Sequence, residues 1–395
     1  MPQTQTPINV HLLHGVVLDV KTIKMMTLYS NSSILFRHTI VSAGILVGIA
    51  CGIGGCKSTY VPPVQSTAKR DSLLARSFSS NGQLQLQEDS DVTNVNPHVR
   101  FGSQDNILVA DFAEFQLRVY DAVGHLLHHY GSKGREAGQF SVPLTSVLQL
   151  SSGTMVVTDF GGTIFQLDSG LSAVMRKTET DLLPLYSATI MNDSTLLLIG
   201  RPRSVRSGEP APLLHLFDLK SNRITRSFFT APVQPFLAPA AVSLGITSAA
   251  IHADTIATVF ALTDTIFLFN TSGAAIGRVP IPFRLFSYIK HPAPSGETVA
   301  DRERWLREIS LITDIFWLRD GSFIIQFYRD DEPRKENGLL IMDRLGRVRM
   351  EALDTPRLIA MDEERTQSRF FFASSGREGM RVWNMATYPA MDSSH

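Results

Sequence analysis

A short phrase of alternating apolar residues, followed by Asp or Asn and a turn, recurs six times along this chain. The copies end, in order, at Asp121, Asp168, Asp218, Asn270, Asp343 and Asn384. A second β-rich run precedes each copy, as in "NILVADF" before Asp121 and "TMVVTDF" before Asp168. Apolar runs bounded by turn residues, repeated roughly every 40 to 50 residues, predict one antiparallel sheet per repeat. One such sheet cannot bury both of its faces alone, so neighbouring sheets must cover each other.

The phase of the repeat is clearest between Asn96 and Pro143, where four successive strands are expected near 98–102, 106–110, 116–121 and 125–130. We therefore expect an all-β fold, a six-bladed β-propeller of four-stranded antiparallel blades over residues 83–390. The expected blades span approximately 96–139, 140–183, 184–235, 236–283, 310–354 and 355–388. A β-sandwich with an accidental period is the alternative.

The sixth expected blade lacks an outer strand, because the chain ends eleven residues after Asn384. The segment "QLQLQE", Gln83–Glu88, alternates polar and apolar residues and is able to supply that strand. Pairing there would close the ring, whereas an open ring would leave two unpaired strand edges. We expect this segment to act as a clasp between the two ends of the propeller.

Both cysteines of the chain lie at the end of an apolar run near the N-terminus. Arg37 and His38 precede an uncharged stretch of 17 residues, Thr39–Gly55, which contains five glycines. A membrane-spanning helix needs about 20 apolar residues, so this stretch is short for one. It fits the apolar region of an export signal, with small residues before the cleavage site.

The residues Ile53-Gly54-Gly55-Cys56 resemble the signal of a bacterial lipoprotein. The resemblance implies cleavage after Gly55 and a covalent lipid on Cys56; Cys51 fits less well, because Gly48 stands where an aliphatic residue is expected. Lys57 resembles an outer-membrane sorting signal of a Gram-negative cell. An ordinary signal peptide or a signal anchor, with Cys56 incidental, is the alternative.

A leader of 55 residues is longer than the usual 15 to 30 or so, which suggests a start at Met25 or Met26. We read residues 1–55 as the leader and 56–82 as a flexible tether rich in Ser, Pro and polar residues. The expected location is the bacterial cell envelope, with the chain lipid-anchored to the outer membrane and facing the periplasm or the surface. No other long apolar run predicts a membrane span.

The first blade resembles the NHL-type repeat, through Val109-Ala110-Asp111, the strand "LRVYD" and the connection "GSKGREAGQFSVP". Val157-Thr158-Asp159 repeats the first element, and the resemblance covers about 75 residues. It groups the chain with six-bladed propeller lipoproteins of the bacterial envelope. We expect Asp111 and Asp159 to fix local turns, because such aspartates bond nearby backbone.

Connectivity predicts that three long segments meet at one end of the propeller. In a four-stranded meander, the loop between the second and third strands and the connection to the next blade share one end. The long segments at that end are Gly200–Pro212, residues 284–309 between blades four and five, and Tyr328–Gly338. A short helix is expected in the insertion, with Thr298 and Asp301 as a capping box. Binding residues concentrate on loops held by a rigid scaffold.

The candidate ligand-binding residues come from these three segments: Arg201, Arg203, Arg206, Trp305, Tyr328, Arg329 and Asp330. Clustered arginines suit a carboxylate, sulfate or phosphate. The alternative is that the arginines are solvated and paired with acidic residues near Asp330, and that the helix merely packs on the rim.

We expect a binding or scaffold module with a protein, peptide or glycan partner. The 37 basic and 37 acidic residues give no net charge, and nucleic-acid binding needs a basic excess. The alternative function is a metal-dependent, lactonase-like hydrolase or lyase with its site at the central channel. Asp314 is the clear acidic residue on an expected inner strand, so a channel metal stays open. We predict no catalytic residue and no cofactor beyond the lipid, since no nucleophile elbow, phosphate loop or zinc-protease motif occurs.

Overall fold

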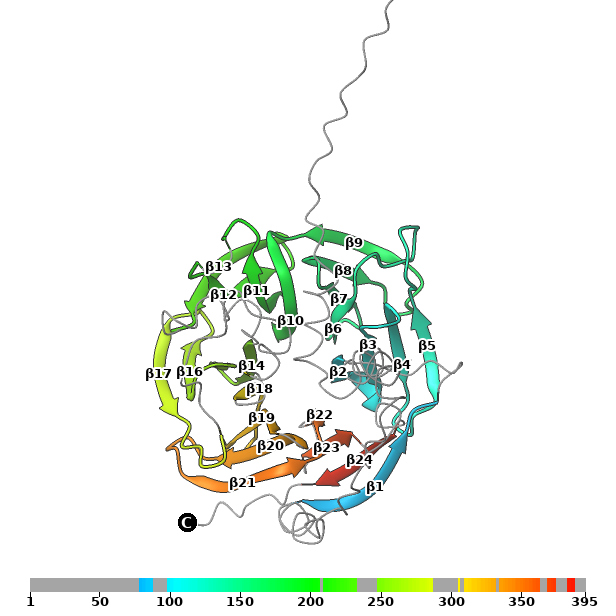
Figure 1. The fold of residues 1–395 in the computed structure, drawn as a ribbon. Helices are drawn as coiled ribbons and strands as arrows, with labels where there is room; N and C mark the ends of the chain where they lie inside the picture. The colour runs from blue at the N-terminus through cyan, green and yellow to red at the C-terminus, as the bar shows by residue number, and fades with distance from the viewer. Residues whose placement is uncertain are drawn as a thin grey trace, which may run out of the picture.

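The computed structural model describes residues 78–87, 98–206, 209–232, 247–286, 305, 309–331, 334–362, 368–373 and 382–387. Within these ranges the chain forms six separate four-stranded antiparallel sheets. The sheets stand around a common axis, each with its first strand innermost and its last strand on the circumference (Figure 1). The predicted six-bladed propeller is therefore confirmed.

The strands of the first three blades follow the chain without crossovers. Blade one holds β2 (His98–Phe101), β3 (Ile107–Asp111), β4 (Gln116–Tyr120) and β5 (Leu126–Tyr130). Blade two holds β6 (Leu144–Gln149), β7 (Met155–Asp159), β8 (Thr163–Leu167) and β9 (Val174–Glu179). Blade three holds β10 (Leu182–Asn192), β11 (Thr195–Pro202), β12 (Pro212–Asp218) and β13 (Arg223–Thr230).

Blades four and five repeat this order, and blade six borrows its outer strand. Blade four holds β14 (Thr247–His252), β15 (Thr255–Phe260), β16 (Thr265–Asn270) and β17 (Ala275–Pro280). Blade five holds β18 (Ser310–Trp317), β19 (Phe323–Asp331), β20 (Arg334–Met342) and β21 (Val348–Thr355). Blade six holds β22 (Leu358–Asp362), β23 (Arg369–Ala373), β24 (Val382–Thr387) and β1 (Ser79–Gln85).

The clasp closes blade six, as the alternation of the N-terminal segment predicted. β1 pairs antiparallel with β24, from Ser79 opposite Thr387 to Gln85 opposite Val382. The strand begins four residues earlier than expected, so residues 79–82 belong to the sheet and not to a tether. Leu84 is buried and packs with Trp383 and Tyr120, which joins blades six and one.

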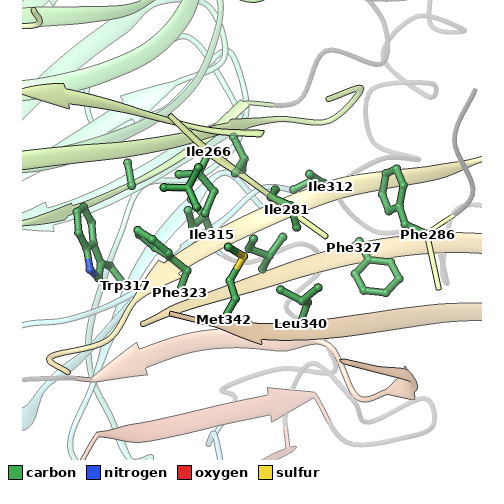
Figure 2. Close-up of a cluster of buried hydrophobic side chains, with 14 residues drawn as sticks. Ile266, Ile281, Phe286, Ile312, Ile315, Trp317, Phe323, Phe327, Leu340 and Met342 are labelled. Carbon is green, nitrogen blue, oxygen red and sulfur yellow. The ribbon is translucent and has the colours of Figure 1, made fainter. Parts of the chain in front are cut away.

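Apolar side chains fill the spaces between neighbouring blades, which explains why the middle strands are buried on both faces. Figure 2 shows the cluster between blades four and five, where Ile266 and Ile281 meet Phe323, Phe327 and Met342. β3 and β7 are buried at every position. Their sequences, ILVAD and MVVTD, are mostly apolar with a terminal Asp, because each strand packs against a blade on both sides.

Polar side chains on or beside the inner strands link successive blades through the backbone. The Ser146 hydroxyl of blade two accepts the N–H of Ala188 in blade three at 2.8 Å. Gln326 of blade five accepts the N–H of Leu358 in blade six through its Oε1 atom at 2.7 Å. These bonds satisfy buried backbone groups that no neighbouring strand of the same sheet pairs.

Tyr328–Gly338 was expected to be a loop, but β19 and β20 stay paired from Tyr328 opposite Asn337 to Asp331 opposite Arg334. The hairpin continues through these charged residues because its hydrogen bonds are made by the backbone and do not depend on the side chains. The expected helix of the insertion falls largely on residues outside the described ranges, and the fold gives it no support. No helix in the described residues is long and apolar enough to cross a membrane.

Candidate functional site

Three charged residues from three blades lie on or beside the innermost strands, which surround the axis of the propeller. Arg100 lies on β2, Asp314 lies on β18, and Arg357 immediately precedes β22. All three are half-buried. We call Arg100, Asp314 and Arg357, together with His98 and Ser248, the axial cluster. With its ionisable groups in their usual states and His98 neutral, the axial cluster carries one excess positive charge.

The electrostatics of the axial cluster show that its charges are poorly solvated. Burial lowers the pKa of the Arg100 and Arg357 guanidiniums, and the Asp314 carboxylate opposes that effect at both. Burial raises the pKa of Asp314, against the lowering effects of Arg357, of the Ser248 hydrogen bond and of Arg100. Ser248 donates to the carboxylate at 2.9 Å, whereas the two guanidiniums act on it through longer-range attraction.

Arg100 has donors to spare. Among the described residues its one hydrogen bond runs from Nη1 to the Val99 carbonyl, at 3.1 Å. A guanidinium carries five N–H donors, so most of them remain for another group. A desolvated charge is costly unless it is paired. Arg100 is therefore suited to hold an anion.

His98 provides a second unsatisfied donor on the same face of β2, because side chains two apart in a strand share a face. Burial, and next the nearby Arg100, lower the pKa of His98 well below its ordinary value, so the ring is neutral. Nδ1 accepts the N–H of Val147 at 3.4 Å, which leaves the proton on Nε2. Nε2 is buried and has no partner among the described residues. Its N–H is an orphan donor beside a cation.

Two of the arginines predicted to bind a ligand donate through Nη2 to backbone carbonyls. Arg201 donates through Nη2 to the carbonyls of Arg206 and Glu209, at 2.6 and 2.7 Å, and so holds its own loop together. Arg203 donates to the Gly161 carbonyl of blade two at 3.2 Å. Arg206 is exposed. The structure thus brings these arginines together at one loop, and the Nη2 contacts of Arg201 and Arg203 help to hold that loop in place.

The base of the same loop is fixed by a buried histidine. His215 on β12 donates from Nε2 to the Gly200 carbonyl at 3.1 Å and accepts from the Ser227 hydroxyl at Nδ1, at 2.8 Å. Burial lowers the pKa of His215, against the raising effect of its backbone bonds. Nearby, burial raises the pKa of Tyr186 to about 12, with Arg201 opposing the shift.

The other predicted site residues do not join the axial cluster as a set. Trp305 is buried, with 5% of its surface exposed, and so does not offer an open aromatic surface. Tyr328 is half-buried on β19. Arg329 and Asp330 lie on the same strand, and their side chains fall outside the described part, as does Cys56. Asp314 alone of the predicted residues belongs to the axial cluster.

The prediction that Asp111 and Asp159 fix local turns is confirmed. Oδ1 of Asp111 accepts the N–H groups of Ala113 and Glu114, at 2.9 and 3.0 Å. Oδ1 of Asp159 accepts the N–H of Thr163 at 2.8 Å. Both carboxyls are buried beneath the loop that joins the second and third strands of their blade.

Sequence reasoning missed Arg100, Arg357 and His98. Acidic and metal-ligating residues on inner strands indicate a channel metal, whereas the informative signal in this chain is a basic residue on or beside a short inner strand. Among the described residues no three His, Cys, Asp or Glu side chains gather as a metal site would require. The two guanidiniums near Asp314 would also repel a divalent cation.

Comparisons with known proteins point to the fold. No family model matches the chain, and no curated protein matches it. A solved member of the DUF4221 family from Bacteroides vulgatus superposes with a TM-score of 0.55 at 9% identity, covering 79% of this chain and 97% of its own. A putative exported protein from Bacteroides fragilis superposes with a TM-score of 0.51 at 12% identity, covering 82% and 96%. At these identities the chain is similar to both structures in its propeller fold.

Proposed function

We propose that this chain is a lipid-anchored envelope protein that works as a binding or scaffold module. It captures an acidic group of a protein, peptide or glycan partner at the axial cluster. The observation that carries this proposal is the pair of unused donors on β2, at Arg100 and His98. Arg100 makes one hydrogen bond among the described residues, to the Val99 carbonyl, and the buried Nε2–H of His98 has no acceptor among them. A carboxylate or phosphate would satisfy both needs.

We call the end of the propeller that holds the inter-blade connections the loop-rich end. The loop between β11 and β12, which we call the Arg201 loop, lies at the same end. The axial cluster lies toward this end. His98 is the first residue of β2, and Arg357 directly precedes β22. Inner strands begin at the loop-rich end, because the connections from the preceding blades arrive there. A partner approaching this end therefore meets the loops first and the axial cluster behind them.

An envelope location rests on two supports. The residues Ile53–Cys56 resemble a lipoprotein signal, and one solved propeller of similar fold is described as a putative exported protein. Labelling with palmitate tests the anchor: the label should disappear in Cys56→Ala and remain in Cys51→Ala. The reverse result would assign the lipid to the other cysteine.

Binding of small anions tests the axial cluster directly. Isothermal titration of the purified protein with glutarate and with inorganic phosphate should show saturable binding of at least one probe. Arg100→Gln should weaken that binding about tenfold or more, since a charge-assisted bond is lost. Arg226→Gln, an exposed arginine on β13, is the matched control and should leave the affinity unchanged. Equal affinities in the two variants, or no binding of either probe, would remove the axial cluster as the site.

A crosslinking pull-down from intact envelopes tests the larger partner. Wild-type protein and Arg226→Gln should recover the same partner, and Arg100→Gln should recover much less of it. Recovery that is insensitive to Arg100 would place the partner elsewhere on the propeller.

A further inference from the structure

The six inner strands of the propeller carry few charged residues. Three of these strands, β6, β10 and β14, contain no Asp, Glu, Lys or Arg. The other three contain Arg100, Asp314 and Asp362. Asp362 is the last residue of β22, at the opposite end of that strand from Arg357, and its Oδ2 accepts a 2.9 Å hydrogen bond from Nε of Arg369. On or beside the inner strands, the charges left to act on an axial ligand are therefore those of Arg100, Arg357 and Asp314.

These three charges come from consecutive blades. Figure 1 shows β18, β22 and β2 in succession around the axis. Asp314 on β18 therefore has Arg357 on the adjoining blade and Arg100 one blade further on. Burial raises the pKa of Asp314, and Arg357 lowers that pKa more than Arg100 does. Arg357 is thus the stronger counter-charge of Asp314, and the charge of Arg100 is the less balanced of the two.

The two unused donors on β2 differ in charge. Arg100 is a cation, whereas His98 is a neutral donor, because its Nδ1 accepts the N–H of Val147 and its proton stays on the buried Nε2. A ligand held by both residues gains two hydrogen bonds but meets one unbalanced positive charge. A carboxylate matches this arrangement, since it has two acceptor oxygens and a single negative charge.

A second negative charge on the ligand has no counterpart in the axial cluster. A phosphate monoester carries close to two negative charges near neutral pH, because its second pKa is about 6. The Asp314 carboxylate would repel the second charge, and repulsion between poorly solvated charges is stronger than in bulk water. Against burial, which raises the pKa of Asp314, the two guanidiniums and the 2.9 Å hydrogen bond from Ser248 favour its charged form.

We propose that the axial cluster selects a carboxylate over a phosphate monoester, and that the negative charge of Asp314 is what excludes the phosphate. This inference rests on the proposed function and narrows the acidic group of the partner to a carboxylate. Arg100 and His98 hold the group by hydrogen bonds, and Asp314 determines how much charge the group can carry. Asp314 is thus a specificity-determining residue that needs no contact with the ligand.

Isothermal titration with two probes of the same alkyl chain tests the selection. The probes are propionate and propyl phosphate, each titrated into the purified protein at pH 8. Asp314→Asn removes the negative charge and keeps an oxygen that accepts the Ser248 hydrogen bond. Asp264→Asn is the matched control, because it removes one negative charge from an exposed position in the loop between β15 and β16, outside the axial cluster.

Wild-type protein should bind propionate about tenfold or more tightly than propyl phosphate. Asp314→Asn should bind propyl phosphate several-fold more tightly than wild type does, so that the preference shrinks or disappears, whereas Asp264→Asn should keep the wild-type preference. Tighter binding of propyl phosphate by wild type would overturn the inference, and this result does not depend on any variant being folded. An unchanged preference in Asp314→Asn that melts like wild type would remove the role of Asp314.

The variant Arg100→Gln separates this inference from the proposed function. If neither probe binds wild type, or if Arg100→Gln binds both as wild type does, the proposed function fails and the selection fails with it. If Arg100→Gln weakens both probes while wild type binds them equally, the axial cluster remains the site and only the selection is refuted.

Discussion

The Ser248 hydroxyl of blade four donates a 2.9 Å hydrogen bond to the Asp314 carboxylate of blade five. The same hydroxyl accepts the N–H of Ile315 at 3.3 Å. One side chain therefore joins two inner strands and positions the only carboxylate of the axial cluster. The same hydrogen bond therefore holds blades four and five together and stabilises the charge of Asp314 in the candidate site.

Replacing Ser248 should weaken the boundary between blades four and five. Ser248→Ala removes both bonds from a buried carboxylate and a backbone N–H, so we expect a loss of about 1 to 3 kcal/mol in unfolding free energy. Urea denaturation followed by tryptophan fluorescence measures this loss. Ser187→Ala is the matched control, because that half-buried serine on β10 makes no comparable bond across blades within the described part of the chain. Equal losses in both variants would contradict the bridging role.

Asp111 should make the fold less stable as the pH rises. Burial raises the pKa of Asp111 from its ordinary value of 3.8 to about 7. A carboxyl with a raised folded pKa supports the fold most at low pH, and that support is lost between about pH 4 and pH 7. Asp111→Asn keeps an acceptor for Ala113 and Glu114 but cannot ionise. The unfolding free energy of the variant relative to that of wild type should therefore rise by a few kcal/mol between pH 5 and pH 8.

Denaturant unfolding at pH 5 and pH 8 measures this rise for Asp111→Asn. The variant Asp168→Asn should show the opposite dependence of stability on pH. Hydrogen bonds from Ala173 and Ser172 lower the pKa of the exposed Asp168 carboxyl. Its contribution is present above pH 4 and is lost as the pH falls through the folded pKa. Asp168→Asn should thus be less stable than wild type near neutral pH, and this difference in unfolding free energy should shrink in acid. The same pH trend in both variants would disprove the assignment for Asp111.

The clasp should determine both stability and solubility. Leu84→Ala removes a buried side chain that packs against Trp383 and Tyr120, so we expect a loss of about 2 to 5 kcal/mol. Fraying of β1 would also expose the edge of β24, which favours edge-to-edge association. Thermal unfolding and size-exclusion chromatography measure the two effects. Gln83→Ala, at an exposed position on the same strand, should change neither by a comparable amount.

The Arg201 loop should loosen without loss of the fold when its internal bonds are removed. Arg201→Gln cannot reach both the Arg206 and Glu209 carbonyls, so the loop between β11 and β12 should become more sensitive to proteolysis. The melting temperature should fall by no more than a few degrees, because the bonds are exposed. Limited trypsin digestion with mass spectrometry measures cleavage after Arg203 and Arg206. Unchanged cleavage would show that Arg201 does not hold the loop.

The sequence contains most of the information about the blades. Each middle strand is an apolar run because it is covered on both sides, so the repeat is visible without any structure. The clasp was also predictable, since Gln83–Glu88 alternates as a half-buried strand does. The prolonged hairpin of blade five was not, because Asp330 and Lys335 are placed opposite each other by backbone register, which charged side chains do not reveal.

The axial cluster could not be assembled from the sequence, because ring closure brings its members together. Arg100 belongs to the first blade and Arg357 to the last, and neither lies in a recognisable motif. A lone arginine in a strand is read as a surface residue until the neighbouring blades are in place. Arg201 and Arg203, which form an anion-site pattern in the sequence, each donate through Nη2 to backbone carbonyls, and these contacts are not visible in the sequence.

The pairing of β1 with β24 also constrains how the protein can fold. Gln83 and Asn384, which are bonded across this pair, lie 301 positions apart in the chain. The first strand of the described chain cannot pair until the last has been synthesised, and contacts between residues so far apart in sequence form slowly. Until then the ring is an open arc with two unpaired strand edges, which favour association with other chains.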